Sequence, residues 1–173
     1  MPLRTKTSVR RLTRLALLTA VALSIHLLEG QIPPVLPIPG AKLGLANVIT
    51  LYTLFTVGPM DTLWVLLSRI VLGSVFSGRA TTLFYSLAGG LLCYAVTCLL
   101  RKTLTHRQLW VAGVAGGLCH NIGQLMAAIA ITRTPSLVVY LPWLLLCGMA
   151  TGLFTGLCAR LLLEKLPGNY KTW

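Results

Sequence analysis

The stretch LFYSLAGGLLCYAVTCLLRKTLTHR, residues 83–107, decides the fold class. Its first eighteen residues carry no charge, and the bases Arg101 and Lys102 follow directly. An apolar run of this length fits the roughly 20 residues that a helix needs to cross the hydrocarbon core of a bilayer. Long apolar runs separated by short basic or proline-containing breaks recur along the chain. The pattern therefore predicts an all-α integral membrane protein.

The composition extends this prediction to the whole chain. Of the 173 residues, 55% are hydrophobic and only 10% are charged, and the mean hydropathy is +0.80. These values lie outside the range of a soluble globular domain. We expect a basic N-terminal tail over residues 1–11, a six-helix transmembrane domain over 12–165 and a C-terminal tail over 166–173. The expected spans are about 12–28, 42–57, 62–76, 83–100, 109–131 and 137–163.

The charge distribution predicts the orientation of these spans. The chain has 15 Lys and Arg against three acidic residues, a net charge of +12. No basic stripe is interleaved with exposed aromatic residues, so a nucleic-acid partner is not expected. With six spans, the three bases on the side opposite the termini are Lys42, Arg79 and Arg133. The terminal side has eleven: Arg4, Lys6, Arg10, Arg11, Arg14, Arg101, Lys102, Arg107, Arg160, Lys165 and Lys171. By the positive-inside rule, both termini are predicted to be cytoplasmic.

Polar residues inside the expected spans mark a candidate binding site. A charge at bilayer depth costs about 2.5–3.5 kcal/mol on insertion scales, so such residues are rarely idle. Arg69 lies in the middle of its span, and His120 and Gln124 share a helix face at i and i+4. We expect an outward-facing, net-positive cavity that binds an anionic or acceptor-rich small molecule, lined by Arg69, His120, Asn121, Gln124, Asn47, Lys42 and Arg79.

Simpler interpretations of these residues stay open. Lys42 and Arg79 could extend to lipid headgroups, and the amides could bond neighbouring helices. His26 and Glu29 could pair at the outer interface. The four prolines within residues 31–40 exclude a helix there, and we interpret this loop as a lid over the cavity.

Other patterns indicate packing, and none indicates catalysis. Gly148, Gly152 and Gly156 recur every fourth residue, and a second group is Gly113, Gly116 and Gly117, so both stretches favour close helix approach. The five cysteines all lie in apolar runs, without a CxxC pair. Asp61 is the only aspartate, and the P-loop pattern is absent, so we expect neither a metal centre, a cofactor nor enzymatic activity.

Several segments resemble a known bacterial family. They are PIPGAKLGLANVITLY (37–52), RIVLGSVFSG (69–78), YSLAGGLL (85–92), HNIGQL (120–125) and YLPWLLLCGMATGLFTG (140–156). These resemble the Gx transporter family, also labelled heptaprenyl diphosphate synthase component I. The resemblance extends from about residue 12 to 165.

That family is similar to the substrate-binding S components of energy-coupling factor transporters. The resemblance implies six helices, a ligand taken from outside under the loop after the first helix, and a location in the bacterial inner membrane. It also implies a transmembrane scaffold subunit and cytoplasmic ATPases as partners, with Ala16 and Ala20 matching the AxxxA docking pattern. It suits an isoprenoid, quinone-precursor or flavin-like ligand. The alternatives are an accessory subunit in polyprenyl diphosphate or quinone metabolism, and an electron-transfer partner.

Overall fold

The computed structural model describes residues 3–32, 43–78 and 80–166, with side chains described from residue 9 onward. These residues form helices and connecting turns, without a strand. Two short 3-10 helices, η1 (His106–Gln108) and η2 (Pro135–Tyr140), lead into α5 and α6. The α-helices are α1 (Leu3–Glu29), α2 (Asn47–Thr56), α3 (Pro59–Ser77), α4 (Ala80–Leu100), α5 (Leu109–Thr132) and α6 (Leu141–Lys165). Helix α1 thus includes most of the predicted tail.

Five of these helices are long and apolar enough to cross a membrane, and α2 is the exception. With ten residues, α2 rises only about 15 Å, half the thickness of a hydrocarbon core of about 30 Å. The predicted second span over residues 42–57 is therefore wrong in length. Within the described part, residues 43–46 are not helical: a turn at residues 45–46 precedes α2, and Gly44 has φ +80°. The six-span prediction becomes a bundle of five long helices and one half-length helix.

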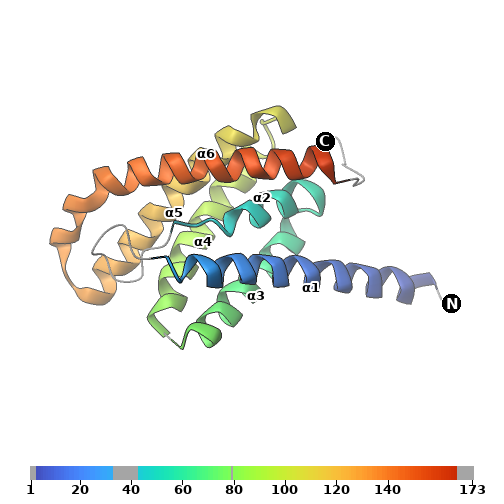
Figure 1. Cartoon of the computed structure of the whole chain (residues 1–173), viewed down its shortest axis with the longest axis horizontal. Coiled ribbons are helices and arrows are strands. Elements are labelled where there is room, and N and C mark those ends of the chain that lie inside the picture. The colour runs from blue at the N-terminus through green and yellow to red at the C-terminus, as the bar shows by residue number, and fades with distance from the viewer. Residues whose placement is uncertain (1–2, 33–42, 79, 167–173) are drawn as a thin grey trace.

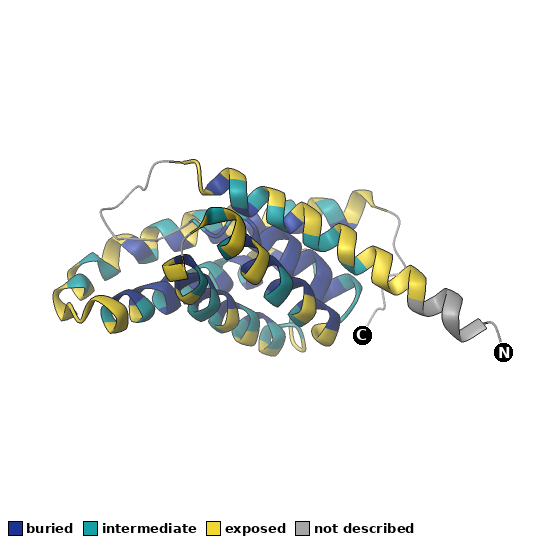
Figure 2. Cartoon of the chain, turned by 90° about the horizontal axis from the view of Figure 1, so that it is seen from below, coloured by how far each residue is buried: buried dark blue, intermediate teal, exposed yellow. Residues whose placement is uncertain are grey.

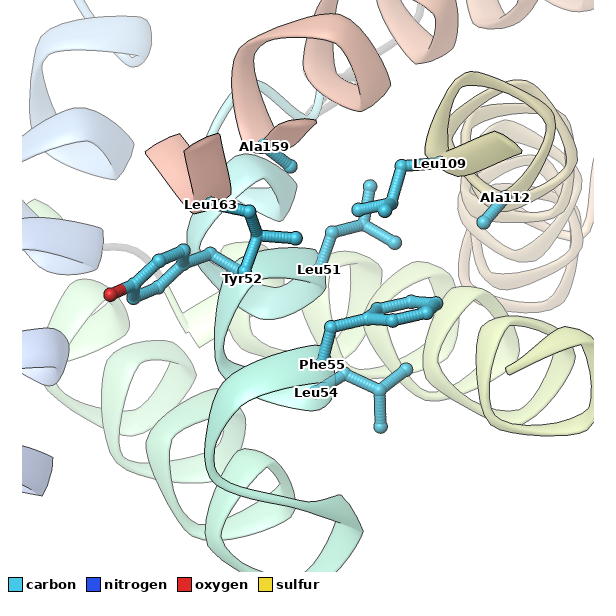
Figure 3. Packing of buried hydrophobic residues seen from close by; sticks show 8 residues of the cluster. All are labelled: Leu51, Tyr52, Leu54, Phe55, Leu109, Ala112, Ala159 and Leu163. Atoms are coloured by element: carbon cyan, nitrogen blue, oxygen red, sulfur yellow. The ribbon is translucent and has the colours of Figure 1, made fainter. Parts of the chain in front are cut away.

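Helix α2 is the centre of the main hydrophobic core. Nine of its ten residues are buried. Figure 3 shows the cluster in which side chains of α2 pack against those of two other helices. Helix α2 contributes Leu51, Tyr52, Leu54 and Phe55, and the partners are Leu109 and Ala112 of α5 and Ala159 and Leu163 of α6. A mainly apolar helix that is buried on every face is stable when protein surrounds it completely. Burial inside the bundle therefore explains how a helix too short to span can lie at membrane depth.

Successive helices run in opposite directions, and α1 begins at the same end of the bundle at which α6 finishes (Figures 1 and 2). Helices α1 and α3 lie side by side and run the same way. Arg11, in the third turn of α1, contacts Asp61 in the first turn of α3. Toward the other ends of these helices, the His26 ring lies against Gly73. This arrangement agrees with the expectation that both termini share one side. That this side is cytoplasmic stays a prediction.

The glycine stripes join α5 to α6. A Cβ atom added to Gly113 would lie 2.2 Å from the carbonyl oxygen of Gly152, and one added to Gly117 would lie 2.3 Å from that of Gly148. Only glycine allows backbones to approach so closely. The prediction that these glycines serve close helix packing is confirmed.

The outer faces of the bundle are apolar. Large side chains such as Leu17, Phe76, Leu99 and Phe154 are more than half exposed, and Figure 2 shows exposed residues along the outward side of the helices. In water such a surface would be unfavourable, whereas lipid tails are its natural surroundings. The fold is that of a multi-pass membrane protein.

Candidate ligand-binding site

The end of α1 is tied to the turn before α2 by Glu29. This side chain is 5% exposed. Its carboxylate accepts a hydrogen bond from the backbone N–H of Gly44 and another, 3.1 Å long, from that of Leu45. Non-helical backbone at membrane depth requires partners supplied by the protein, because lipid offers none. Glu29 supplies them, and it thereby fixes the position at which α2 begins.

Asn47 and His120 meet beside this turn. The His120 ring packs so closely on Gly44 that an added Cβ would lie 2.9 Å from its Cδ2 atom and 3.0 Å from Nδ2 of Asn47. The left-handed φ of Gly44 also favours glycine. Gly44 is therefore the residue that lets the first residue of α2 and the middle of α5 share one polar environment.

His120 and Gln124 form a pair on α5, as their spacing predicts. The Nε2 atoms of the two side chains are 3.0 Å apart, in hydrogen-bond contact. Both lie against Gly89 of α4, where an added Cβ would be 2.9 Å from His120 Nδ1 and 2.9 Å from Gln124 Cγ. The absence of a side chain at Gly89 creates the space that this pair occupies.

Arg69 of α3 completes the cluster. Its side chain is 3% exposed and its Nη2 atom approaches Gly90 of α4. It attracts Glu29 electrostatically and lies close enough to influence His120. Asp61, near the start of α3, is eight residues away, which corresponds to about 12 Å of helix rise. Arg69 therefore lies near the middle of the bundle.

We call Glu29, Asn47, Arg69, His120 and Gln124 the polar cluster. Helices α1, α2, α3 and α5 supply its residues, and α4 forms a wall through Gly89 and Gly90. Among the described residues, three of its buried atoms, Asn47 Oδ1, Arg69 Nε and His120 Nδ1, have no hydrogen-bond partner. An unpaired buried polar atom costs about 1–3 kcal/mol. The polar cluster thus retains an amide acceptor, a cationic donor and a histidine ring nitrogen that the described protein does not use.

The structure separates Asn121 from its neighbours in the sequence. Its Nδ2 atom donates a 2.7 Å hydrogen bond to the carbonyl of Leu144 in α6 and lies beside Gly148. This bond between helices accounts for its burial. A role for Asn121 in ligand binding stays a prediction that this contact does not require.

Two other candidate residues, Lys42 and Arg79, lie outside the described residues, as does most of the expected lid over residues 31–40. The polar cluster itself carries one cation, Arg69, and one anion, Glu29. The expected net-positive character is therefore not a property of its described members. The sequence prediction missed the role of Glu29, although a lone carboxylate at the end of an apolar run was a usable signal.

Ala16 and Ala20, the predicted docking residues, lie on a different surface. Both are exposed, and both line an open groove of about 670 Å³ between α1 and α3. The helix surface is thus hollow where the AxxxA pattern occurs. Whether a subunit docks there stays a prediction.

The bundle and its polar cluster define a helical, multi-pass membrane protein with charged and amide groups held at membrane depth. The chain belongs to the heptaprenyl diphosphate synthase component I family, whose model matches residues 18–162. This match confirms the family resemblance found in the sequence. Comparisons with curated proteins and with solved structures gave no match.

Proposed function

We propose that the chain is the substrate-binding membrane subunit of an energy-coupling-factor-like transporter, and that the polar cluster holds its ligand. The observation that carries the proposal is the convergence of Arg69, Asn47 and His120 from three different helices on one buried location. Polar side chains inside a membrane are costly unless they have a function or a partner. A ligand-binding role would explain why polar side chains lie at this location despite their unfavourable insertion free energy.

Two of the unused atoms of the polar cluster indicate which ligand would fit it. Arg69 offers a guanidinium N–H to an acceptor, and Asn47 Oδ1 accepts from a donor. A small molecule with a carboxylate, phosphate or carbonyl group beside an N–H or O–H would satisfy both. Because Glu29 offsets the charge of Arg69, both anionic and polar neutral molecules suit the described residues. In this proposal uptake is driven by cytoplasmic ATPases that act through a transmembrane scaffold subunit.

The test is the small-molecule content of the purified protein. We expect mass spectrometry of a denatured extract to show one molecule that co-purifies with the wild type and is lost from Arg69→Gln. Arg107→Gln, an exposed position in η1 before α5, is the matched control and should retain it. Circular dichroism checks that both variants stay helical. If a folded Arg69→Gln retains the same molecule in the same amount, the polar cluster is not the ligand site.

The family description favours a second candidate function. The words "heptaprenyl diphosphate synthase component I" name one component of a synthase and so point to a partner component. In this alternative the chain is a membrane accessory subunit that anchors a soluble prenyl synthase or handles its product, and the chain itself performs no catalysis. Co-expression with such a synthase decides between the two. A stable complex with increased synthase activity would favour the accessory role, and a complex with an ATPase-bearing scaffold would favour transport.

A further inference from the structure

The groove between α1 and α3 has the features of a lipid site. We propose that it holds one anionic phospholipid from the leaflet next to the start of α1, with the phosphate at Arg11 and an acyl chain running along Ala16 and Ala20. This site is separate from the polar cluster. The residues that line the groove are mainly apolar, and Arg11 lies at one end of it. Among the apolar ones are Leu15, Leu23, Trp64 and Leu72.

Arg11 provides the headgroup contact. Its Nε atom donates to Asp61 Oδ1 and Oδ2, at 3.0 and 3.2 Å, and Nη2 also bonds Oδ1. A guanidinium has five N–H donors, so Nη1 and one N–H of Nη2 are left for a phosphate. The Arg11 side chain is 59% exposed. Arg10 and Arg14 are exposed within one turn, so this end stays positive after Asp61 is counted.

The length of the groove matches one leaflet. From Arg11 to Leu23, α1 rises about 18 Å, close to half of a hydrocarbon core of about 30 Å. Ala16 and Ala20 leave the helix surface hollow over the middle of this length. Trp64 lies near the start of α3, on the Arg11 side, and is 60% exposed. Tryptophan prefers the headgroup level of a bilayer, so the charged end of the groove lies where a lipid has its phosphate.

The same charge argues against a second copy of this chain as the occupant. A protein helix would have to present a carboxylate to the free donors of Arg11. The chain has three acidic residues, and all are engaged: Glu29 with backbone amides, Asp61 with Arg11 and Glu164 with Arg160. A foreign helix with a carboxylate at this depth would bear its insertion cost. A phospholipid brings its charge at the level of the interface, where water and ions already accommodate it.

The experiment measures lipid retention by the full-length protein in detergent. Native mass spectrometry is used with phosphatidylglycerol and phosphatidylcholine of identical acyl chains. We expect one phosphatidylglycerol to bind about tenfold more tightly than phosphatidylcholine, because the choline ammonium of phosphatidylcholine offsets the phosphate charge that Arg11 attracts, and an attraction of about 1.4 kcal/mol corresponds to tenfold. Arg11→Gln should abolish this preference. Lys102→Gln, an exposed cation at the same end of the bundle but outside the groove, should preserve it.

A second pair of variants tests the groove without touching the Arg11–Asp61 contact. Ala20→Phe fills the hollow, whereas Leu17→Phe enlarges an exposed position of α1 that does not line it. We expect only Ala20→Phe to lose the retained lipid. Equal retention of the two lipids, or equal behaviour of the two phenylalanine variants, would overturn the proposal. Displacement of phosphatidylglycerol by a polyprenyl diphosphate or by a partner helix would also overturn it. Arg69→Gln should leave lipid retention unchanged, so this result is independent of the ligand assigned to the polar cluster.

Discussion

Removing the Glu29 carboxylate should loosen the joint between α1 and α2. In the structure this buried group accepts hydrogen bonds from the backbone N–H groups of Gly44 and Leu45. A hydrogen bond to a charged group contributes about 1.5–3 kcal/mol. Glu29→Ala leaves both amides without this acceptor and should cost about 3–6 kcal/mol. Glu29→Gln keeps one oxygen and should cost about half as much.

The assay is thermal unfolding in detergent, followed by far-UV circular dichroism. For a chain of this size, 1 kcal/mol corresponds to about 2–4 °C, so Glu29→Gln should melt about 3–12 °C below the wild type. Glu164→Gln is the matched control. Glu164 makes an exposed pair with Arg160, 2.7 Å long, and such pairs contribute about 0–1 kcal/mol. If Glu29→Ala melts with the wild type, the carboxylate does not hold the turn before α2 and this reasoning is wrong.

Two further predictions concern helix packing. Gly113→Ala would place a methyl group 2.2 Å from the carbonyl oxygen of Gly152 and should lower the unfolding free energy by about 1–3 kcal/mol. In Gly90→Ala the added methyl group meets only flexible side-chain ends at 3.1 and 3.3 Å. This second variant should be neutral or stabilising. Equal melting temperatures for the two alanine variants would contradict this difference. Asn121→Ala removes the hydrogen bond to Leu144 and should cost about 1–2 kcal/mol while the co-purified ligand is retained. Loss of the ligand from a folded Asn121→Ala would instead assign Asn121 to the ligand site.

The sequence predicted the long helices because each residue contributes to them largely by itself. Hydropathy measures how favourably a side chain transfers from water to an apolar medium, and five long apolar runs are enough to locate five helices. The helix of residues 109–132 was located almost to the residue. The i, i+4 spacing also placed His120 and Gln124 on one face, where their side chains meet.

The failures share one cause. A span was predicted over residues 42–57, yet of the described residues 43–57 only 47–56 are helical, because the preceding turn finds its hydrogen-bond partner in Glu29, fifteen residues before Gly44. Asn121 likewise donates its hydrogen bond to Leu144 of α6, whereas His120 and Gln124 belong to the polar cluster. In both cases the partner is distant in the sequence, and no local pattern names it.

The sequence by itself determined that this chain is a helical membrane protein, where its five long apolar helices lie and that His120 and Gln124 share one helix face. These properties follow from the transfer of single residues between water and lipid, and from helical spacing. Only the tertiary structure decided that α2 is a short, enclosed helix, that Glu29 holds the turn before it, and that Arg69 and His120 share one polar environment. Inside a bilayer, buried hydrogen bonds and charges depend on which helices become neighbours, and that choice is made by the packing of the whole bundle.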